Sequence, residues 1–434
     1  MRRSSLAPVL APLLALALAA TAACSPASSG RTAPQAPEDG PGKLVVWLQT
    51  DARTTWPKSV EAATAEFRRV YPQVQVSVAY QAWADHLAKF DAAAQADTVP
   101  DVIELGNSET ALYNGAGAFV DLSARRADFD GSSGWQKPLL DACSLGGRLY
   151  CVPYYGGTRA VVYRRDLLAD AGIERPPASW TELLDAVRAL ADRHRDEPGF
   201  SPFFLPGQHP YGALPFVFDA GGAIATRRPD GRWHCELSSP ASVAGLRNWK
   251  ALVDAGMRGD RTANDLGAAP ALAAGTAAMS FSTNGQLVKV FGKEGDPALK
   301  DRIGSFPMPS PTRAGRYAPP FLGGSVLAVP AKSGHQRWAT EWIRRFTSTE
   351  REKEFLAGGF LANTMALASD DPQRAGYFTG LEDSWSVPPA DNWAAVEKAN
   401  LLRQLLVDIA TGRSSPEDAT RRYGRRIEDV LNTS

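Results

Sequence analysis

The sequence contains few residues of the kinds that bind metals, and it has no excess of charge. Among its 434 residues are 4 Cys and 5 His, and 47 basic residues balance 47 acidic ones. No Cys-x-x-Cys or His-Glu-x-x-His spacing occurs, which disfavours a metal site. A neutral chain also lacks the basic patches of a nucleic-acid-binding protein. We therefore expect no metal, no nucleic acid and a partner close to neutral in charge.

Several catalytic motifs are missing as well. The sequence has no G-x-S-x-G, no P-loop and no Gly-rich dinucleotide signature. These absences argue against the nucleotide-dependent and serine-nucleophile enzymes that carry them, and we expect no cofactor. A hydrolase that works with two carboxylates stays open, because such a pair has no sequence signature.

A short apolar run at the N-terminus predicts a secretory signal peptide over 1–23. Two arginines precede the run, and two prolines interrupt it, so a membrane-spanning helix is not expected. The "TAAC" that follows is similar to a bacterial lipobox, in which Cys24 is lipidated and becomes the mature N-terminus. Thr21 stands where an aliphatic residue is usual. Plain cleavage near Ala23 is the alternative.

The segment 24–42 is rich in Pro, Ser and Gly and has almost nothing to bury. This composition predicts a flexible tether between the N-terminus and the folded protein.

The other three cysteines suggest one disulfide. "CSLGGRLYC" reads as a hairpin, because its Gly-Gly pair suits a tight turn, and Cys143 and Cys151 would then face each other. Outside the cytoplasm such a pair oxidises, and we expect a Cys143–Cys151 disulfide. Cys235 remains as a buried thiol.

The remaining chain is long enough for two lobes and alternates strands with helices. "KLVVWLQT" (43–50) is followed by an amphipathic helix that ends at Pro72, then by further strand and helix patterns up to "PDVIELG". This order predicts parallel strands with crossover helices, hence an α/β lobe. The pattern restarts after residue 158, and the last third reads as helical.

The ordered motifs resemble a known family. "KLVVW", "KFDAAAQADTVPDVIEL", "AGAFVDL", "VPYYGGTRAVVYRRDLL" and "VPPADNW" follow one another as in the bacterial family 1 extracellular solute-binding proteins of the maltose-binding type. The resemblance implies an α/β, two-lobed periplasmic-binding-protein fold with interlobe hinge crossings and a ligand cleft. It implies discontinuous lobes: lobe 1 from 43–157 and 318–365, and lobe 2 from 158–317 and 366–434.

The stretch "VPYYGGTR" resembles the first hinge crossing of that family. Tyr154 and Tyr155 could offer ring faces and hydroxyls to a sugar, and Arg159 could form a hydrogen-bonded fork to neighbouring hydroxyls. Gly156 and Gly157 allow close backbone approach. The alternative is that the tyrosines fill the core.

Polar residues at the ends of the parallel strands are further candidates, because ligands gather there in α/β lobes. Asp51 follows the first strand, and Asn107 and Glu109 follow "PDVIEL". The family places sugar contacts at the latter position. Helix capping is the alternative for all three.

The resemblance supplies five more ligand-binding candidates. Tyr211 stands where relatives have a stacking aromatic, and Asn284 ends the "AAMSFSTNG" strand. Gly323 and Gly324 resemble the second crossing, and Trp393 matches a late cleft tryptophan. Packing in the core is the alternative for Trp393.

The function implied is that of an extracytoplasmic, membrane-anchored lipoprotein, monomeric and not an enzyme. It would capture a neutral mono- or oligosaccharide and deliver it to the transmembrane permease subunits of an ABC importer. Two alternatives remain: the same fold binding a charged small solute, such as a glycerol phosphodiester or a polyamine, and a secreted hydrolase.

Overall fold

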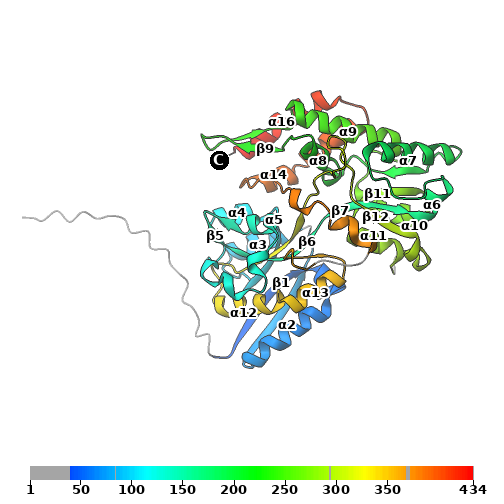
Figure 1. The fold of residues 1–434 in the computed structure, drawn as a ribbon. Coiled ribbons are helices and arrows are strands. Elements are labelled where there is room, and N and C mark those ends of the chain that lie inside the picture. Colours follow the sequence, from blue (N-terminus) through cyan, green and yellow to red (C-terminus); the bar gives the residue numbers. More distant parts are fainter. Residues whose placement is uncertain (1–39, 84, 293–294, 368–371, 434) are drawn as a thin grey trace, which may run out of the picture.

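The computed structural model describes residues 40–83, 85–292, 295–367 and 372–433. The expected signal peptide and Cys24 lie outside these ranges, as does most of the expected tether. Within them, no helix is both long and apolar enough to cross a membrane. The expected two-lobed α/β architecture is confirmed: the chain builds two main sheets, each with its own buried core (Figure 1).

The first lobe is built on a six-stranded sheet of order β14-β6-β13-β3-β1-β2. Its elements are β1 (Gly42–Gln49), α1 (Thr50–Thr55), α2 (Pro57–Val70), β2 (Val74–Gln81), α3 (His86–Gln95), β3 (Val102–Gly106), α4 (Thr110–Gly115), α5 (Lys137–Ala142), β4 (Ser144–Leu145), β5 (Arg148–Leu149), β6 (Cys151–Gly157), β13 (Gly323–Ala328), α12 (Gln336–Phe346), α13 (Thr349–Ala357) and β14 (Leu361–Ala362).

The strands β1, β2 and β3 are parallel, as the alternation of strands and helices predicts. Helix α2 begins with Pro57 and buries Val60, Ala63 and Phe67, a spacing of three and four that places them on one face. Because the strands run the same way, their carboxyl ends meet at one edge of the sheet. That edge carries the candidate residues of this lobe.

The second lobe is built on a four-stranded sheet of order β12-β7-β11-β8. Its elements are β7 (Arg159–Arg164), α6 (Arg165–Asp170), α7 (Trp180–Arg193), β8 (Ser201–Phe204), α8 (Pro210–Asp219), β9 (Ala225–Arg227), β10 (Trp233–Cys235), α9 (Pro240–Gly256), α10 (Ala268–Ala274), β11 (Ala277–Thr283), α11 (Asn284–Phe291), β12 (Ile303–Phe306), α14 (Trp393–Lys398), α15 (Leu401–Ala410) and α16 (Pro416–Leu431). The C-terminal helix α16 packs beside α9, whereas α12 packs beside α2 of the first lobe (Figure 1).

The chain passes between the sheets at the ends of β6 and β13. Strand β6 ends at Gly157 in the first sheet, and β7 begins at Arg159 in the second. Thr158 stands between them, and its buried hydroxyl donates to the Tyr377 carbonyl oxygen at 2.8 Å. The chain returns at Gly323, where β13 pairs antiparallel with β6. The two crossings therefore run side by side.

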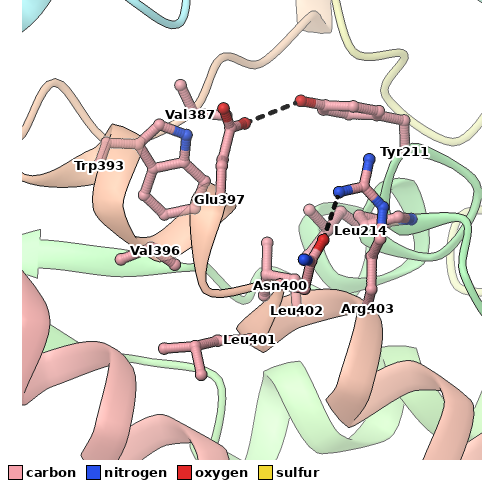
Figure 2. Close-up of a pocket in the computed structure, with 11 residues that line it drawn as sticks. Tyr211, Leu214, Val387, Trp393, Val396, Glu397, Asn400, Leu401, Leu402 and Arg403 are labelled. Carbon is pink, nitrogen blue, oxygen red and sulfur yellow. Dashed lines mark hydrogen bonds between the residues drawn. The ribbon is translucent and has the colours of Figure 1, made fainter. Parts of the chain in front are cut away.

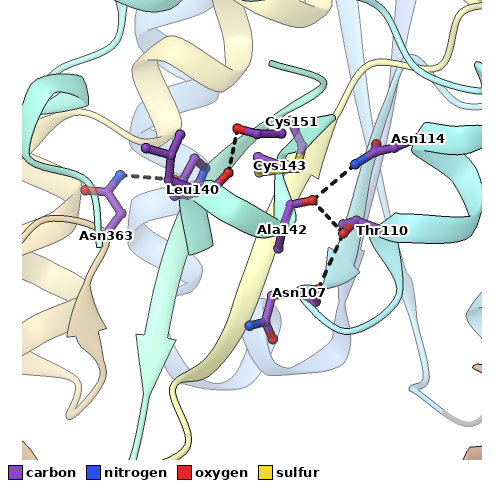
Figure 3. Close-up of a disulfide and its surroundings, with 10 residues drawn as sticks. Asn107, Thr110, Asn114, Leu140, Ala142, Cys143, Cys151 and Asn363 are labelled. Carbon is purple, nitrogen blue, oxygen red and sulfur yellow. Dashed lines mark hydrogen bonds between the residues drawn. A yellow bond between two sulfur atoms is a disulfide. The ribbon is translucent and has the colours of Figure 1, made fainter. Parts of the chain in front are cut away.

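A disulfide joins Cys143 and Cys151 at the base of the β4–β5 hairpin (Figure 3). Both Gly146 and Gly147 have positive φ, at 59° and 78°, which a tight turn of this kind requires. Cys235 is a buried free thiol. This is the arrangement expected from the sequence.

The residue before the bridge also fixes helix α4. The carbonyl oxygen of Ala142 accepts hydrogen bonds from Thr110 Oγ1 at 2.6 Å and from Asn114 Nδ2 at 3.1 Å (Figure 3). Because Thr110 begins α4, the bridge region sets the position of the helix that follows Glu109.

A buried carboxyl group lies inside the first sheet. Glu104 of β3 is 1% exposed, and its Oε2 accepts the backbone N–H of Gln49 at 2.8 Å. Burial raises the pKa of this carboxyl to about 7, although the hydrogen bond from Gln49 opposes the rise.

Replacing both Cys143 and Cys151 with Ala should lower the free energy of unfolding by about 2–3 kcal/mol, because the bridge restricts the unfolded chain. Urea unfolding measures this change. Peptide mapping without reductant should link these two residues and find Cys235 free. A bridge that includes Cys235 would contradict the assignment.

Glu104→Gln should stabilise the protein at about pH 8. The folded-state pKa lies above that of an unfolded Glu, about 4.3, so between these values the folded state holds more protons and the free energy of unfolding falls as pH rises. We expect a gain of about 1–3 kcal/mol at about pH 8 that disappears toward about pH 4. Glu61→Gln, at an exposed site on α2, is the control. A gain of equal size at both pH values would contradict this account.

Candidate binding site

Tyr154 and Tyr155 belong to the core, so the expectation that a tyrosine of this pair lines the cleft is wrong. Tyr154 is fully buried, and Trp56 Nε1 donates to its hydroxyl. Tyr155 is 7% exposed and packs edge-on against Trp56 and Phe360. The register between β6 and β13 shifts at this point, since Ser325 pairs with Tyr155 and the next residue pairs with Pro153. Such a bulge turns neighbouring side chains toward the same side of a strand.

Arg159 leaves the crossing and enters the second lobe. Its Nη2 lies 3.5 Å from Asp265 Oδ2, and its guanidinium carbon lies 5.0 Å from the centre of the Tyr211 ring. His209 also approaches Asp265, at 3.6 Å, but burial lowers the pKa of His209 to about 3, so its ring is neutral. The Asp265 carboxylate therefore pairs with Arg159.

The second lobe contains a pocket where α8, α14 and α15 meet (Figure 2). The open space around its lining residues, counted out into solvent at its mouth, is about 520 Å³. Four residues supply its polar groups: Tyr211, Glu397, Asn400 and Arg403. Trp393 supplies its aromatic wall. The rest of the wall is Pro210, Leu214, Val387, Val396, Leu401 and Leu402.

The polar groups of the pocket are held by hydrogen bonds to one another. The Tyr211 hydroxyl donates to Glu397 Oε1 at 3.1 Å, and Arg403 Nη1 donates to Asn400 Oδ1 at 2.9 Å (Figure 2). The Tyr211 ring stacks on Phe321, with centres 4.4 Å apart. With Phe321 and Arg159 against the ring, Tyr211 presents its hydroxyl end to the pocket rather than the free face expected from the sequence.

The first lobe approaches the segment before α14 and acts on the charge of Glu397. Burial raises the pKa of the Glu397 carboxyl, and the negative charge of Glu109, which precedes α4, raises it further. Helix α4 also approaches the segment before α14: a Cβ placed on Gly115 would lie 3.4 Å from Asp391 Oδ1. The two lobes therefore approach each other between α4 and the segment before α14.

Two expected residues, Asp51 and Glu109, lie together at the strand-end edge of the first lobe. Asp51 Oδ2 accepts from Trp83 Nε1 at 2.8 Å, and Glu109 Oε2 approaches His86 Nε2 at 2.9 Å. Trp83 and His86 were not expected here. Trp83 is 40% exposed, the sole tryptophan among the exposed large hydrophobic residues of the described chain.

Asn107 and the two glycines serve the sheet in this structure, and their expected ligand contacts stay predictions. Asn107 donates from its backbone to the Gly324 carbonyl at 2.9 Å and from Nδ2 to the Leu322 carbonyl at 3.1 Å. A Cβ on Gly324 would lie 2.2 Å from the Tyr155 carbonyl oxygen, and one on Gly323 would lie 2.7 Å from the Phe321 ring. The neighbouring strand and ring, rather than a ligand, require glycine at these positions.

Asn284 is placed apart from the pocket. It begins α11, and its Nδ2 donates to the Gly359 carbonyl oxygen of the first lobe. It lines a separate hollow beside the first crossing, together with Gly157 and Tyr377. Trp393, by contrast, lies in the wall of the pocket near Tyr211, although it is only 1% exposed. Of the resemblance-based candidates, the structure thus brings Tyr211, Trp393 and Arg159 together.

The pocket of the second lobe and the strand-end edge of the first lobe both combine aromatic groups with fixed hydrogen-bonding groups. Aromatic and aliphatic walls pack against the C–H surfaces of a ligand, while carboxylate, amide, guanidinium and phenol groups pair with its hydroxyls. No group of His, Cys, Asp and Glu in the described ranges is arranged to hold a metal ion.

Comparisons with known proteins find a matching family and a related protein. A family model for bacterial extracellular solute-binding proteins matches residues 62–379. The diacetylchitobiose-binding protein DasA of Streptomyces coelicolor is 28% identical over 399 residues, which cover 90% of this chain and 89% of DasA.

Solved structures share the fold. The GacH receptor of Streptomyces glaucescens, known in complex with acarbose, has a TM-score of 0.75 at 21% identity and covers 90% of this chain and 98% of its own. The sugar-binding protein MalE of Xanthomonas citri has a TM-score of 0.76 at 19% identity, covering 90% of this chain and 97% of its own.

Proposed function

The chain belongs to the bacterial extracellular solute-binding proteins, and on that premise we propose that it captures a neutral mono- or oligosaccharide for an ABC importer. The observation that carries the proposal is the pocket of Tyr211, Trp393, Glu397 and Arg403, and the exposed Trp83 of the first lobe adds a second aromatic surface. The ligands of the two relatives, diacetylchitobiose for DasA and acarbose for GacH, support the assignment to carbohydrates.

The composition of the pocket favours a neutral ligand over a charged one. Arg159 is paired with the Asp265 carboxylate. Burial raises the pKa of the Glu397 carboxyl and the charge of Arg403 acts on it to lower that pKa, so each cation next to the pocket has a carboxyl group nearby. Glu397 accepts the Tyr211 hydroxyl and carries a raised pKa. A phosphodiester needs clustered free cations and a polyamine needs clustered free anions, whereas a polyol is satisfied by paired, directional donors and acceptors.

The protein binds and releases its ligand without chemical change, in this proposal, and passes it to the transmembrane subunits of the permease. It acts as a monomer, anchored outside the cytoplasmic membrane through lipid on Cys24. The tether at 24–42 gives the folded lobes freedom to reach the permease.

A thermal-shift screen with N,N′-diacetylchitobiose, maltose, maltotetraose and acarbose tests the function directly. A ligand that binds only the folded state raises its melting temperature, by an amount that grows with the logarithm of the ligand concentration divided by the dissociation constant. The sugar that stabilises most is then incubated with the protein and analysed by mass spectrometry. Intact sugar supports a binding protein, whereas cleavage products would establish the hydrolase alternative.

Tyr211→Ala should weaken binding of that sugar by about ten- to a hundredfold. The substitution removes a hydrogen-bonded hydroxyl and a wall of the pocket, a loss of about 1–3 kcal/mol. Isothermal titration calorimetry measures the affinity. Tyr71→Ala is the matched control, because Tyr71 follows α2 and stacks on Phe67 away from the pocket. Equal affinities for Tyr211→Ala and wild type would show that the sugar binds outside this pocket.

Cys24→Ala should release the protein from membranes of its native host into the soluble fraction, because a lipid anchor requires the cysteine at the cleavage site. Fractionation followed by immunoblotting measures this, and mass spectrometry of the wild-type N-terminus identifies the lipid. A soluble wild-type protein that begins at another residue contradicts the anchor and favours plain cleavage near Ala23.

A further inference from the structure

His86 lies directly beneath the strand-end edge of the first lobe, and both of its ring nitrogens face oxygen atoms. The residue is 2% exposed. Its Nδ1 lies 3.0 Å from the carbonyl oxygen of Trp83, and its Nε2 lies 2.9 Å from Glu109 Oε2. Neither a carbonyl nor a carboxylate oxygen can donate a hydrogen bond, so both contacts require an N–H on the ring. Only the protonated imidazolium has two.

We propose that the His86 cation is a positioning residue that holds the Glu109 carboxylate and the Trp83 segment in the arrangement that binds ligand, so that losing its proton weakens binding. The proposal rests on the function proposed above, because it names the regulation of that same site. Glu109 and Trp83 contact the ligand, and His86 acts through them.

The Glu109 carboxylate is anchored on one side. Its Oε2 accepts from His86 and also from the backbone N–H of Gly106, at 2.7 Å. Among the described residues no hydrogen bond to Glu109 Oε1 occurs, and the side chain keeps 17% of its surface exposed. That second oxygen is therefore the one available to accept from a sugar hydroxyl.

His86 also supports the Trp83 ring. The two rings meet edge to face, with centres 5.1 Å apart, and Trp83 Nε1 is bonded to Asp51. A single chain of contacts thus runs from Asp51 through Trp83 and His86 to Glu109. It joins residues that follow three neighbouring strands, β1, β2 and β3.

Loss of the His86 proton breaks one end of this chain. If the neutral ring keeps its Nδ1–H toward Trp83, the Nε2 lone pair faces the Glu109 oxygen and repels it. If it keeps the Nε2–H instead, the Nδ1 lone pair faces the Trp83 carbonyl. Either the carboxylate or the Trp83 backbone must then move away.

The charges around His86 favour the cation. Glu109 contacts it from the loop before α4, and Asp51 lies beyond Trp83 on α1. Glu104 of β3, whose pKa is raised to about 7, adds a negative charge near His86 only as pH rises. Asp85, directly before the helix of His86, pairs with Lys89 of that helix at 3.0 Å. Burial alone lowers the pKa of His86, but the hydrogen bond and charge of Glu109 outweigh it, so the pKa is raised above its ordinary value.

The direction of the pH effect follows. The binding arrangement needs the protonated ring, so affinity is complete below the raised pKa and is lost as pH rises through it. For the wild-type protein and N,N′-diacetylchitobiose, we expect the dissociation constant to rise about tenfold between about pH 6 and about pH 9. Maltose replaces that sugar if it stabilises the protein more.

His86→Gln removes the titratable charge of the ring but keeps a hydrogen-bond donor toward Glu109. Its amide N–H can still donate to Glu109 but does not titrate, so the dissociation constant should stay within about threefold of wild type at about pH 6 and should not change with pH. His234→Ala is the matched control. His234 pairs with Glu428 at 2.8 Å on the outer side of the second lobe, and its loss should leave the wild-type pH profile intact.

Titration calorimetry across this pH range decides the matter. A wild-type affinity that does not change with pH, or a pH profile that persists in His86→Gln, would overturn the proposal. If none of the sugars binds wild type at any pH, the proposed function fails, and the ring itself is then examined in the sugar-free protein. Nitrogen-15 NMR at about pH 6 should show two N–H groups on His86. A single N–H would overturn the proposal without any variant.

Discussion

The close pairing of β6 with β13 is the constraint on which the binding geometry depends. Gly156 pairs with Gly324, and a Cβ on Gly324 would meet the Tyr155 carbonyl oxygen at 2.2 Å, so only glycine permits this approach. The two crossings are thereby held next to each other. Arg159 follows the first crossing and Phe321 precedes the second, and both side chains contact the Tyr211 ring. The pocket wall is thus positioned by the crossings themselves.

Much of the fold follows from the sequence, because burial patterns and parallel connectivity are local signals. The strand-end rule placed Asp51 and Glu109 at the edge where the structure has them. The same rule missed Trp83, which follows β2, because its segment reads as part of a helix. Side-chain direction in β6 could not be predicted, since a bulge, which depends on the partner strand, turns Tyr154 and Tyr155 into the core.

Other site residues have no sequence signal of their own. Glu397 and Arg403 lie in helices whose apolar stripes match ordinary core packing, and only the meeting of α14 and α15 with α8 brings them to Tyr211. Asn107 shows the reverse. Its type and position suit ligand binding, yet its side-chain amide donates to the Leu322 carbonyl just before β13 and accepts from the Gly324 backbone N–H. Whether a polar strand-end residue is free depends on a strand that arrives more than two hundred residues later in the chain.

The exposure of Trp83 has an optical consequence. Most of the tryptophans are buried, and their emission is insulated from solvent, but this indole is 40% exposed beside the pocket-facing edge. Indole emission shifts to shorter wavelength when water leaves the ring. A solute that covers Trp83 would therefore shift the protein's intrinsic tryptophan emission to shorter wavelength, so that binding could be followed without a dye.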